Sequence, residues 1–387
     1  MDITRFLSGT AVAAAVLNYF VLCSYGEKTV EADIRSAKAA ILVETTTGQV
    51  LCGYNENLRL PIASVTKIMT LLLAAEKMEE GALSFEENAV CSEHAASMDG
   101  SVIWLEAGET MSVGDIVKSV VISSANDACV VLAEHIAGSE EEFVGMMNER
   151  ADQLGMTGTH FSNCVGYDDK DHYSTARDIS VMAAELKKYD YFDDYFLTRL
   201  DSVRTGTTRE TQLLNTNKLI NSYSGITGLK TGTTDGAGCC FVGTAKRGDM
   251  ELAAVVLGCG SDGDRFAAAE NLLDCGFNDF EKITPHPDTA ELIEIPVENG
   301  IKKGVDTRYS DISAVILPKG GGSSIKYHYS RTGSVSAPVQ QGQVLGFVTM
   351  TSGDEVVATA KIIAAESIEE MDIKSCLEYL FRAFFGF

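Results

Sequence analysis

The sequence predicts an α/β (α+β) domain over residues 33–283, a small all-β domain over residues 284–366 and a C-terminal helix over residues 367–387. Apolar segments with strand character lie near both ends of the first region, and helical patterns fill the part between them. Strands from both ends of such a region pair into one sheet that the helices cover. Beyond residues 284–288, which hold two of the six prolines, short apolar segments alternate with glycine-rich turns, as in small all-β domains.

Local patterns predict the individual elements. Several helices should begin at a serine or threonine that is followed three residues later by an acidic residue, a pattern typical of helix N-termini. In the first domain we expect strands at residues 39–44, 49–53, 228–230, 240–245 and 252–257, and helices at 64–81, 112–121, 126–136, 139–154, from 175 and at about 264–273. In the second domain we expect strands at residues 292–296, 314–317, 325–329, 344–350 and 356–363.

The composition narrows the classes of partner. The 387 residues carry a net charge of −24, which argues against nucleic acid as a partner. The six histidines are scattered, and none of the ten cysteines forms a Cys-x-x-Cys pair, so we expect neither a metal nor another cofactor. Most cysteines lie among apolar neighbours, as small core residues do, and we expect most of them to be reduced.

The first segment has the pattern of a targeting signal. Arg5 precedes an apolar run from residue 6 to residue 23, and small residues follow at positions that a signal peptidase recognises. We therefore expect a cleaved signal peptide over residues 1–32 and an extracytoplasmic protein. The alternatives are a retained anchor and a buried helix.

The last segment is expected to form an amphipathic helix. Apolar side chains recur at helical spacing with charged ones opposite, and the segment is too short and too polar to span a bilayer. We expect it to lie in the membrane interface with its aromatic side chains inserted, which would make the protein peripheral on the outer face of the cytoplasmic membrane. The alternative is a helix docked on the β-domain. The apolar positions are Ile373, Leu377, Leu380, Phe381, Phe384 and Phe385.

A candidate nucleophile lies at the start of the first long helix. Ser64 and Lys67 are three residues apart, so they share one helix face, and the residues that follow are apolar on every side. A hydroxyl beside an amine at the start of a buried helix is a candidate for an activated nucleophile. The alternative is an ordinary serine cap. Ser323 and Lys326 repeat the spacing, but no helical pattern follows them.

Two further motifs complete a known pattern. Ser124 and Asn126 lie in a break between two helices, and residues 230–232, Lys-Thr-Gly, follow a strand and lead into Thr233. In this chain order, the three motifs resemble those of the penicillin-recognising serine enzymes. Residues 204–206 and 331–333 approach the third motif, with Arg in place of Lys, but lack the apolar strand before it.

A wider match narrows the resemblance. Residues 60–70, 172–178, 215–219 and 228–238 resemble the low-molecular-mass penicillin-binding proteins that are D-alanyl-D-alanine carboxypeptidases. The resemblance implies a serine β-lactamase/DD-peptidase-like domain with an antiparallel sheet and a helical subdomain. It also implies removal of the terminal D-alanine from the peptidoglycan pentapeptide through an acyl-enzyme on Ser64, and covalent inhibition by β-lactams.

The catalytic roles combine spacing and resemblance. Helical spacing makes Lys67 the candidate base for the Ser64 proton, provided that burial or a nearby positive charge such as Lys230 lowers its pKa. The resemblance makes Ser124 a proton relay to the leaving amine. Which residue acts as the base in this superfamily is disputed.

The substrate-binding roles come from the resemblance alone. It implies that Asn126 holds the substrate amide, and that the backbone N–H groups of Ser64 and Thr233 form the oxyanion hole. Lys230 and Thr231, in the motif that continues through Gly232, would meet the terminal carboxylate, and Arg265 would help to bind it. The alternative for Arg265 is a surface ion pair with Glu270 or Asp262.

Two other functions fit the same motifs. A serine β-lactamase shares the fold, but no Glu-x-x-Leu-Asn segment follows Asn126, and Ala125 is the middle residue of the second motif. A non-catalytic wall-binding protein on the same scaffold would be expected to have lost Ser64, Lys67 or Lys230, and all three are present.

Overall fold

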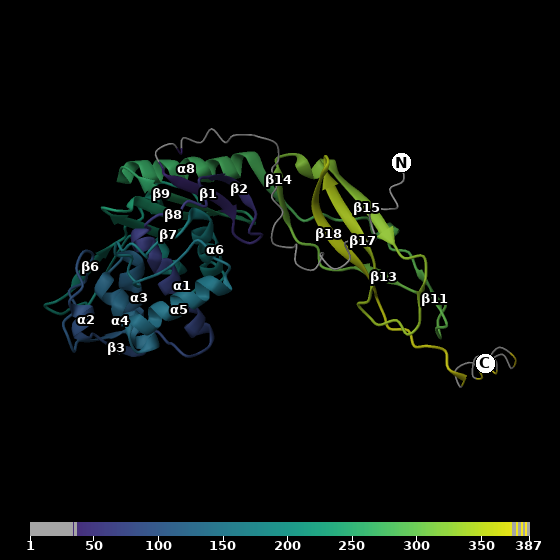
Figure 1. Cartoon of the computed structure of the whole chain (residues 1–387), viewed down its shortest axis with the longest axis horizontal. Helices are drawn as coiled ribbons and strands as arrows, with labels where there is room; N and C mark the ends of the chain where they lie inside the picture. Colours follow the sequence, from purple (N-terminus) through teal and green to yellow (C-terminus); the bar gives the residue numbers. More distant parts are fainter. Residues whose placement is uncertain (1–33, 35–36, 374–376, 378–380, 382–383, 385–387) are drawn as a thin grey trace.

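The computed structural model describes residue 34, residues 37–373 and residues 377, 381 and 384. The predicted signal peptide over residues 1–32 lies outside these described residues. Figure 1 shows an elongated molecule with two separate parts, a larger α/β domain and a β-domain beside it. The C-terminal segment lies at the end of the β-domain that is remote from the larger domain.

A five-stranded antiparallel sheet forms the centre of the larger domain, as the sequence predicts. Its order is β2-β1-β9-β8-β7, so the N-terminal hairpin joins the C-terminal meander through the β1–β9 pair. The strands are β1 (Ala39–Glu44), β2 (Val50–Tyr54), β7 (Ile226–Thr234), β8 (Gly238–Arg247) and β9 (Met250–Cys259). Strand β7 forms one edge, which leaves its outer side open to the helical part.

The two faces of this sheet are covered differently (Figure 1). Because successive side chains of a strand point to opposite faces, Leu42 and Val256 pack toward α8 (Asp262–Asp279), and Ile41 and Val255 pack toward the helical part. Helix α8 is longer at both ends than the predicted helix. Its first turn is capped by Ser261, whose hydroxyl accepts the Asp264 N–H, a signal that the sequence analysis missed.

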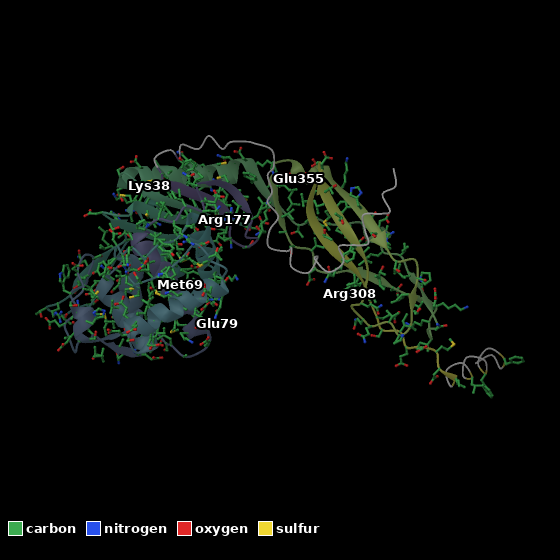
Figure 2. The ribbon with its side chains drawn as sticks, in the orientation of Figure 1. Lys38, Met69, Glu79, Arg177, Arg308 and Glu355 are labelled. Atoms are coloured by element: carbon green, nitrogen blue, oxygen red, sulfur yellow. The ribbon has the colours of Figure 1, made fainter. Side chains whose placement is uncertain are left out.

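The middle of the chain is helical, as predicted. Its serine and threonine caps form, with the hydroxyls of Ser112, Ser139 and Thr175 each accepting the N–H three residues on. The long helices are α1 (Lys67–Glu79), α3 (Val113–Ile122), α4 (Asn126–Ala137), α5 (Glu140–Gln153) and α6 (Ala176–Leu186). The fully buried Met69 of α1 lies inside this part of the domain (Figure 2).

Several short elements were not predicted from the sequence. They are too short to show a clear periodicity. They are α2 (Glu93–Ala96), α7 (Asp193–Leu197), the pair β3 (Asn88–Val90) and β4 (Thr110–Ser112), and the pair β5 (Leu200–Val203) and β6 (Thr211–Leu214).

The second domain consists of short sheets, as expected. Arg308 and Glu355 lie on it (Figure 2). Its four-stranded sheet has the order β13-β18-β17-β15, and β12-β11-β16 form a three-stranded sheet. The strands are β11 (Ile295–Glu298), β12 (Gly304–Val305), β13 (Thr307–Tyr309), β14 (Val315–Pro318), β15 (Ile325–Arg331), β16 (Val335–Ser336), β17 (Val344–Ser352) and β18 (Glu355–Ala364), with single 3-10 turns at Thr289–Glu291 and Gly321–Ser324.

The two domains are in contact through side chains and strand pairing, in addition to the connecting segment at residues 284–288. Strand β10 (Phe280–Ile283), which directly follows α8, pairs with β14 of the second domain. The Gln49 side-chain amide donates to the Ile316 carbonyl at 2.9 Å and accepts the Ile316 N–H at 3.0 Å. Ile316 also packs into the core between the sheet and α8. The boundary at residue 284 stays a prediction, because β10 before it pairs with a strand beyond it.

Candidate active site

Ser64 and Lys67 lie where a 3-10 turn (Ala63–Thr66) runs into helix α1. Lys67 Nζ lies 3.0 Å from Ser64 Oγ, so the predicted contact across one turn is present. Lys67 is fully buried, whereas Ser64 is half-buried. The amine is therefore held in a dry environment beside a hydroxyl that remains accessible.

The other partners of Lys67 fix the direction of its donors. Nζ donates to Asn126 Oδ1 at 2.7 Å and to the Val165 carbonyl at 2.8 Å. Both of these oxygens can only accept, so they take two N–H groups of the amine. In a neutral Lys67, the lone pair is then left for the Ser64 hydroxyl.

A second amine and hydroxyl lie on the facing elements. Lys230 of β7 donates from Nζ to Ser124 Oγ at 2.8 Å and to the Thr231 carbonyl at 3.2 Å. Ser124 joins α3 to α4 and has a left-handed backbone with φ of 62°. Ser124 lies between the two helices, and Asn126 is the first residue of α4. Both residues of the second motif therefore lie at the junction of the two helices.

Burial lowers the pKa of both amines. Desolvation is the main cause for Lys67, and the pKa of this amine lies below its usual range. The pKa of Lys230 is lowered further, first by burial and then by the positive charges of Lys67 and Arg265. The sequence analysis invoked repulsion between the two amines, and this repulsion is mutual, so it disfavours a state in which both amines are charged.

The Lys-Thr-Gly motif packs directly against the Ser64 turn. A Cβ atom on Gly232 would come within 2.9 Å of both the Ile62 carbonyl oxygen and the Ser64 nitrogen, so a glycine is needed for this approach. Thr231 donates to Thr216 Oγ1 at 2.7 Å, and the Thr233 side chain is exposed beside it. Strand β7 at Gly232 and the turn that carries Ser64 are therefore in direct contact.

Arg265 does more than form an ion pair at the surface, which was the alternative role considered from the sequence. It is buried in the first turn of α8, and its Nη1 donates to the Gly232 carbonyl at 2.9 Å, to Thr233 Oγ1 at 2.9 Å and to the Cys240 carbonyl at 3.2 Å. Its Nη2 pairs with Asp262, which is one of the two partners considered from the sequence. Arg265 therefore links α8 to the end of the third motif.

The sequence analysis missed three residues around Asn126. The Asn126 Nδ2 donates to the Asp99 carbonyl at 2.7 Å, and the Tyr167 hydroxyl donates to Asp99 Oδ1 at 2.7 Å. Val165 contributes only its carbonyl to Lys67. Backbone acceptors and isolated loop residues leave no pattern in the sequence, so nothing in it singled out these positions.

The near-matches to the motifs do not form a second site. Ser323 and Lys326 lie in the β-domain, where the Ser323 hydroxyl donates to the Gly320 carbonyl and Lys326 is exposed. Arg204 pairs with Glu109, and Arg331 pairs with Glu291. Within the part of the chain that the structure describes, no group of three His, Cys, Asp or Glu residues could hold a metal ion.

Comparison with known proteins now identifies the family. The pattern of the D-alanyl-D-alanine carboxypeptidases (peptidase S11) matches residues 26–261, more than half of the chain. The chain belongs to the D-alanyl-D-alanine carboxypeptidase family. A second pattern, the C-terminal domain of penicillin-binding protein 5, matches residues 280–370. This carboxypeptidase is thus a serine hydrolase of the low-molecular-mass penicillin-binding class, as the three motifs predicted.

Its relatives cover nearly the whole chain. The carboxypeptidase is 38% identical to D-alanyl-D-alanine carboxypeptidase DacF of Bacillus subtilis, over 89% of each chain. It is 34% identical to DacC of Escherichia coli, over 95% of this chain and 93% of that one. Among solved structures, penicillin-binding protein 5 of Haemophilus influenzae superposes with a TM-score of 0.78 at 28% identity, covering 87% of this chain and 98% of that one.

A third similar protein has been solved with a β-lactam bound. Penicillin-binding protein D2 of Listeria monocytogenes, solved with cefotaxime bound, has a TM-score of 0.56 and 32% identity to the carboxypeptidase. The match covers 62% of this chain and 97% of that one.

Proposed function

We propose that Ser64 is the nucleophile with which this carboxypeptidase removes the terminal D-alanine from peptidoglycan stem peptides. The observation that carries this proposal is the Lys67 amine 3.0 Å from the Ser64 hydroxyl, with its other two contacts taken by acceptors. A buried amine with a lowered pKa can take the serine proton near neutral pH.

Acylation follows from this arrangement. Ser64 Oγ attacks the carbonyl carbon between the two D-alanines as its proton moves to Lys67, and the oxyanion is held by the backbone N–H groups of Ser64 and Thr233. The C–N bond then breaks as the proton reaches the leaving D-alanine amine through Ser124, which Lys230 hydrogen-bonds at 2.8 Å. Water subsequently hydrolyses the ester on Ser64 and restores the free enzyme.

The substrate is held at both ends of the scissile bond. On the leaving side, Lys230, Thr231 and Thr233 meet the terminal carboxylate across Gly232. Arg265 positions Thr233 through a hydrogen bond of 2.9 Å, and its charge favours an anion there. On the acyl side, Asn126 binds the substrate amide, and its own amide is oriented by Lys67 and the Asp99 carbonyl.

We further propose that β-lactams acylate Ser64. These drugs present a reactive carbonyl and a carboxylate at the positions of the substrate groups. The Listeria monocytogenes protein solved with cefotaxime and with ampicillin supports the proposal, because it is 32% identical to this chain and the match covers 62% of it.

We propose an extracytoplasmic enzyme that is peripheral to the membrane. The signal pattern of residues 1–32 supports export. For the tail, Ile373 and Phe384 are helical with 82% and 87% of their surface exposed, and Leu377 and Phe381 are exposed as well. Among the described residues, no helix is both long and apolar enough to cross a bilayer. The exposed apolar side chains favour insertion of the tail into the membrane interface over docking on the β-domain.

The assignment of Ser64 is tested by the intact mass of the protein after treatment with penicillin. We expect one adduct on the wild type and none on Ser64→Ala. Ser323→Ala is the matched control, because it removes the serine of the other Ser-x-x-Lys sequence, and it should keep the adduct. An adduct on Ser64→Ala, or its loss from Ser323→Ala, would contradict the assignment.

The activity is tested by D-alanine release from a peptide that ends in D-Ala-D-Ala. We expect release by the wild type and slow turnover of a chromogenic β-lactam. Rapid β-lactam turnover without D-alanine release would instead favour the β-lactamase alternative. Absence of both release and labelling would favour a non-catalytic wall-binding protein.

A further inference from the structure

Three buried polar side chains of the nucleophile turn and helix α1 face a single segment, residues 160–173. Thr66, Lys67 and Thr70 have no exposed surface, although the neighbouring positions of the helix are apolar. Thr70 is four and three residues from the other two, so all three share one side of the helix. A buried polar group without a partner is costly, so the segment that faces them must supply hydrogen bonds.

Only one of these three contacts uses a side chain of the segment. Lys67 and Thr70 donate to two main-chain carbonyls, at 2.8 and 2.9 Å, which any residue type would supply. Thr66 instead contacts the side chain of His172, with 2.7 Å between Oγ1 and Nε2. This contact therefore depends on the residue type at position 172, and His172 has no role in the mechanism proposed above.

The hydrogen bonds of His172 define which ring nitrogen carries the proton. The Ser162 N–H lies 3.1 Å from Nδ1, and a backbone N–H can only donate, so Nδ1 accepts. In a neutral ring the proton is then on Nε2, which donates to the Thr66 hydroxyl. The ring is buried and packs edge-on against Phe161, and burial lowers the pKa of His172 to about 4. At neutral pH the ring is therefore a fixed donor rather than a proton carrier.

Main-chain contacts hold the same part of the chain against the nucleophile turn. Leu60 and Ser174 exchange two backbone hydrogen bonds of 2.9 and 3.0 Å shortly before the turn begins. A Cβ atom on Gly166 would lie 2.8 Å from the Ser64 nitrogen, so the segment touches the turn directly at this glycine. The segment is thus close enough for a side chain on it to set the position of the turn.

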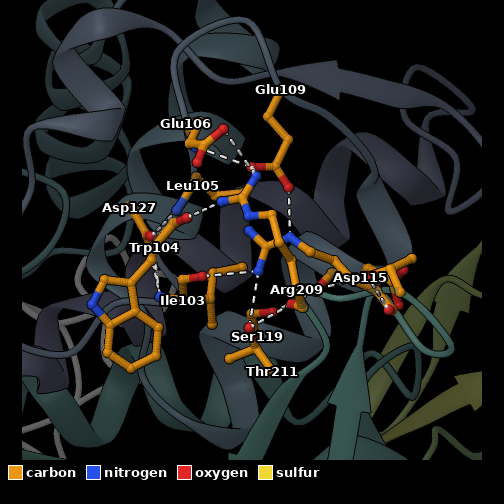
Figure 3. Close-up of polar contacts among 12 residues, drawn as sticks. Ile103, Trp104, Leu105, Glu106, Glu109, Asp115, Ser119, Asp127, Arg209 and Thr211 are labelled. Carbon is orange, nitrogen blue, oxygen red and sulfur yellow. Dashed lines mark hydrogen bonds and ion pairs between the residues drawn. The ribbon is translucent and has the colours of Figure 1, made fainter.

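The substrate-binding Asn126 is anchored by a different part of the chain. The next residue of α4 is the buried Asp127, whose carboxylate accepts the N–H groups of Ile103 and Leu105 at 3.0–3.1 Å (Figure 3). These anchors lie outside the segment that faces the nucleophile turn. A disturbance of that segment should therefore affect the reacting groups more than the binding of the substrate amide.

We propose that His172 is a positioning residue for acyl transfer. Its Nε2–H donates to Thr66 and so fixes the turn that presents the nucleophile and the base. Because Thr66 lies between Ser64 and Lys67 in the chain, a shift of Thr66 displaces both reacting groups. This inference rests on the proposed carboxypeptidase function and concerns a residue outside the three motifs.

Variants at position 172 separate a hydrogen-bond donor from a side chain that only fills space. We expect His172→Leu to lower kcat for D-alanine release from a D-Ala-D-Ala peptide at least about tenfold, because displacements of about 1 Å are costly in catalysis. KM should change by less than about twofold. His172→Gln keeps a side-chain N–H donor and should stay within about threefold of the wild type. His328→Leu is the matched control, because His328 also faces a threonine hydroxyl, at 3.4 Å, but is exposed in the β-domain; it should keep wild-type kinetics.

A double variant tests whether Thr66 transmits the effect. We expect Thr66→Val to lower kcat about as much as His172→Leu. The protein with both changes should be no more than about twofold slower than either single variant, because both changes break the same contact. Thr66→Val keeps the shape of the side chain, so it decides the question if His172→Leu does not fold.

Several outcomes would overturn the inference: a wild-type kcat in His172→Leu or Thr66→Val, a loss that appears mainly in KM, a His172→Gln protein as slow as His172→Leu, or losses that multiply in the double variant. Each of these would leave the carboxypeptidase function intact. A wild-type protein that releases no D-alanine would instead contradict that function itself.

Discussion

Lys67 Nζ donates a hydrogen bond of 2.7 Å to Asn126 Oδ1, so the first residue of α1 and the first residue of α4 share one buried polar contact. This contact joins the first and second motifs. It also orients Asn126 so that its Nδ2 meets the Asp99 carbonyl. The amine and the amide therefore depend on each other for their orientation.

Asn126→Asp should impair acylation by changing the charge of Lys67. A carboxylate at this contact stabilises the ammonium, which raises the Lys67 pKa and removes the free base at neutral pH. We expect acylation by a fluorescent penicillin at pH 7 to fall at least about tenfold, which corresponds to one unit of pKa. Raising the pH should restore part of the rate. Asn88→Asp, at an exposed position of β3, should leave the pH profile unchanged, and a profile for Asn126→Asp that falls equally at all pH values would contradict this explanation.

Lys230→Met should stabilise the fold while it abolishes activity. Burial lowers the Lys230 pKa in the folded state, so the unfolded chain binds more protons between that lowered pKa and the ordinary value near 10.4. In this window, the free energy of unfolding of the wild type decreases as the pH falls. The gain from Lys230→Met should therefore be larger at acidic pH. We expect at least about 1 kcal/mol at pH 7, or a rise in Tm of about 2–4 °C.

The control for this prediction is Lys326→Met, because Lys326 is exposed in the β-domain. Thermal unfolding followed at pH 6, 7 and 9 checks both variants. A Lys230→Met protein that is less stable than the wild type at pH 6 would show that the Lys230 contact with Ser124 outweighs the cost of burying the amine.

Gly232→Ala should disturb the nucleophile more than the fold. The added Cβ would lie 2.9 Å from the Ser64 nitrogen and the Ile62 carbonyl oxygen, so β7 and the Ser64 turn must move apart. We expect penicillin acylation to slow at least about tenfold, because catalysis is sensitive to displacements of about 1 Å. Gly333→Ala, which adds a Cβ with no atom within 4 Å, should acylate at the wild-type rate. Unchanged acylation in Gly232→Ala would mean that this close approach is not needed.

Removal of the exposed apolar side chains from the tail should abolish membrane binding without affecting catalysis. We expect Leu377→Ser, Phe381→Ser and Phe384→Ser, combined in one protein, to prevent flotation with lipid vesicles. D-alanine release from a soluble peptide should stay within about twofold of the wild type, because the tail is remote from the catalytic domain (Figure 1). The exposed Phe347→Ser of β17 serves as the control. Continued flotation of the triple variant would favour another mode of attachment.

The helices and strands that were predicted correctly are those with a sequence pattern within the element itself, such as a helix cap or an apolar run. The capped helices were found from residues three or four positions apart, and the long strands were found from continuous apolar runs. Short pairs such as β5 and β6 were missed because strands of four residues show too little periodicity to be recognised. The N-terminal extension of α8 was missed because its cap at Ser261 precedes the apolar pattern.

The sequence by itself determined which chemical groups are available: one hydroxyl beside one amine on a helical turn, a serine and an amide in a helix break, and a lysine on a strand. Only the tertiary structure decided that Lys230 meets Ser124, that backbone carbonyls of Asp99 and Val165 orient Asn126 and Lys67, and that Arg204 pairs with Glu109. The physical reason is the separation along the chain over which each kind of contact acts. Helical spacing sets the neighbours of a residue within one turn, whereas contacts across 100 residues depend on how buried surfaces pack together.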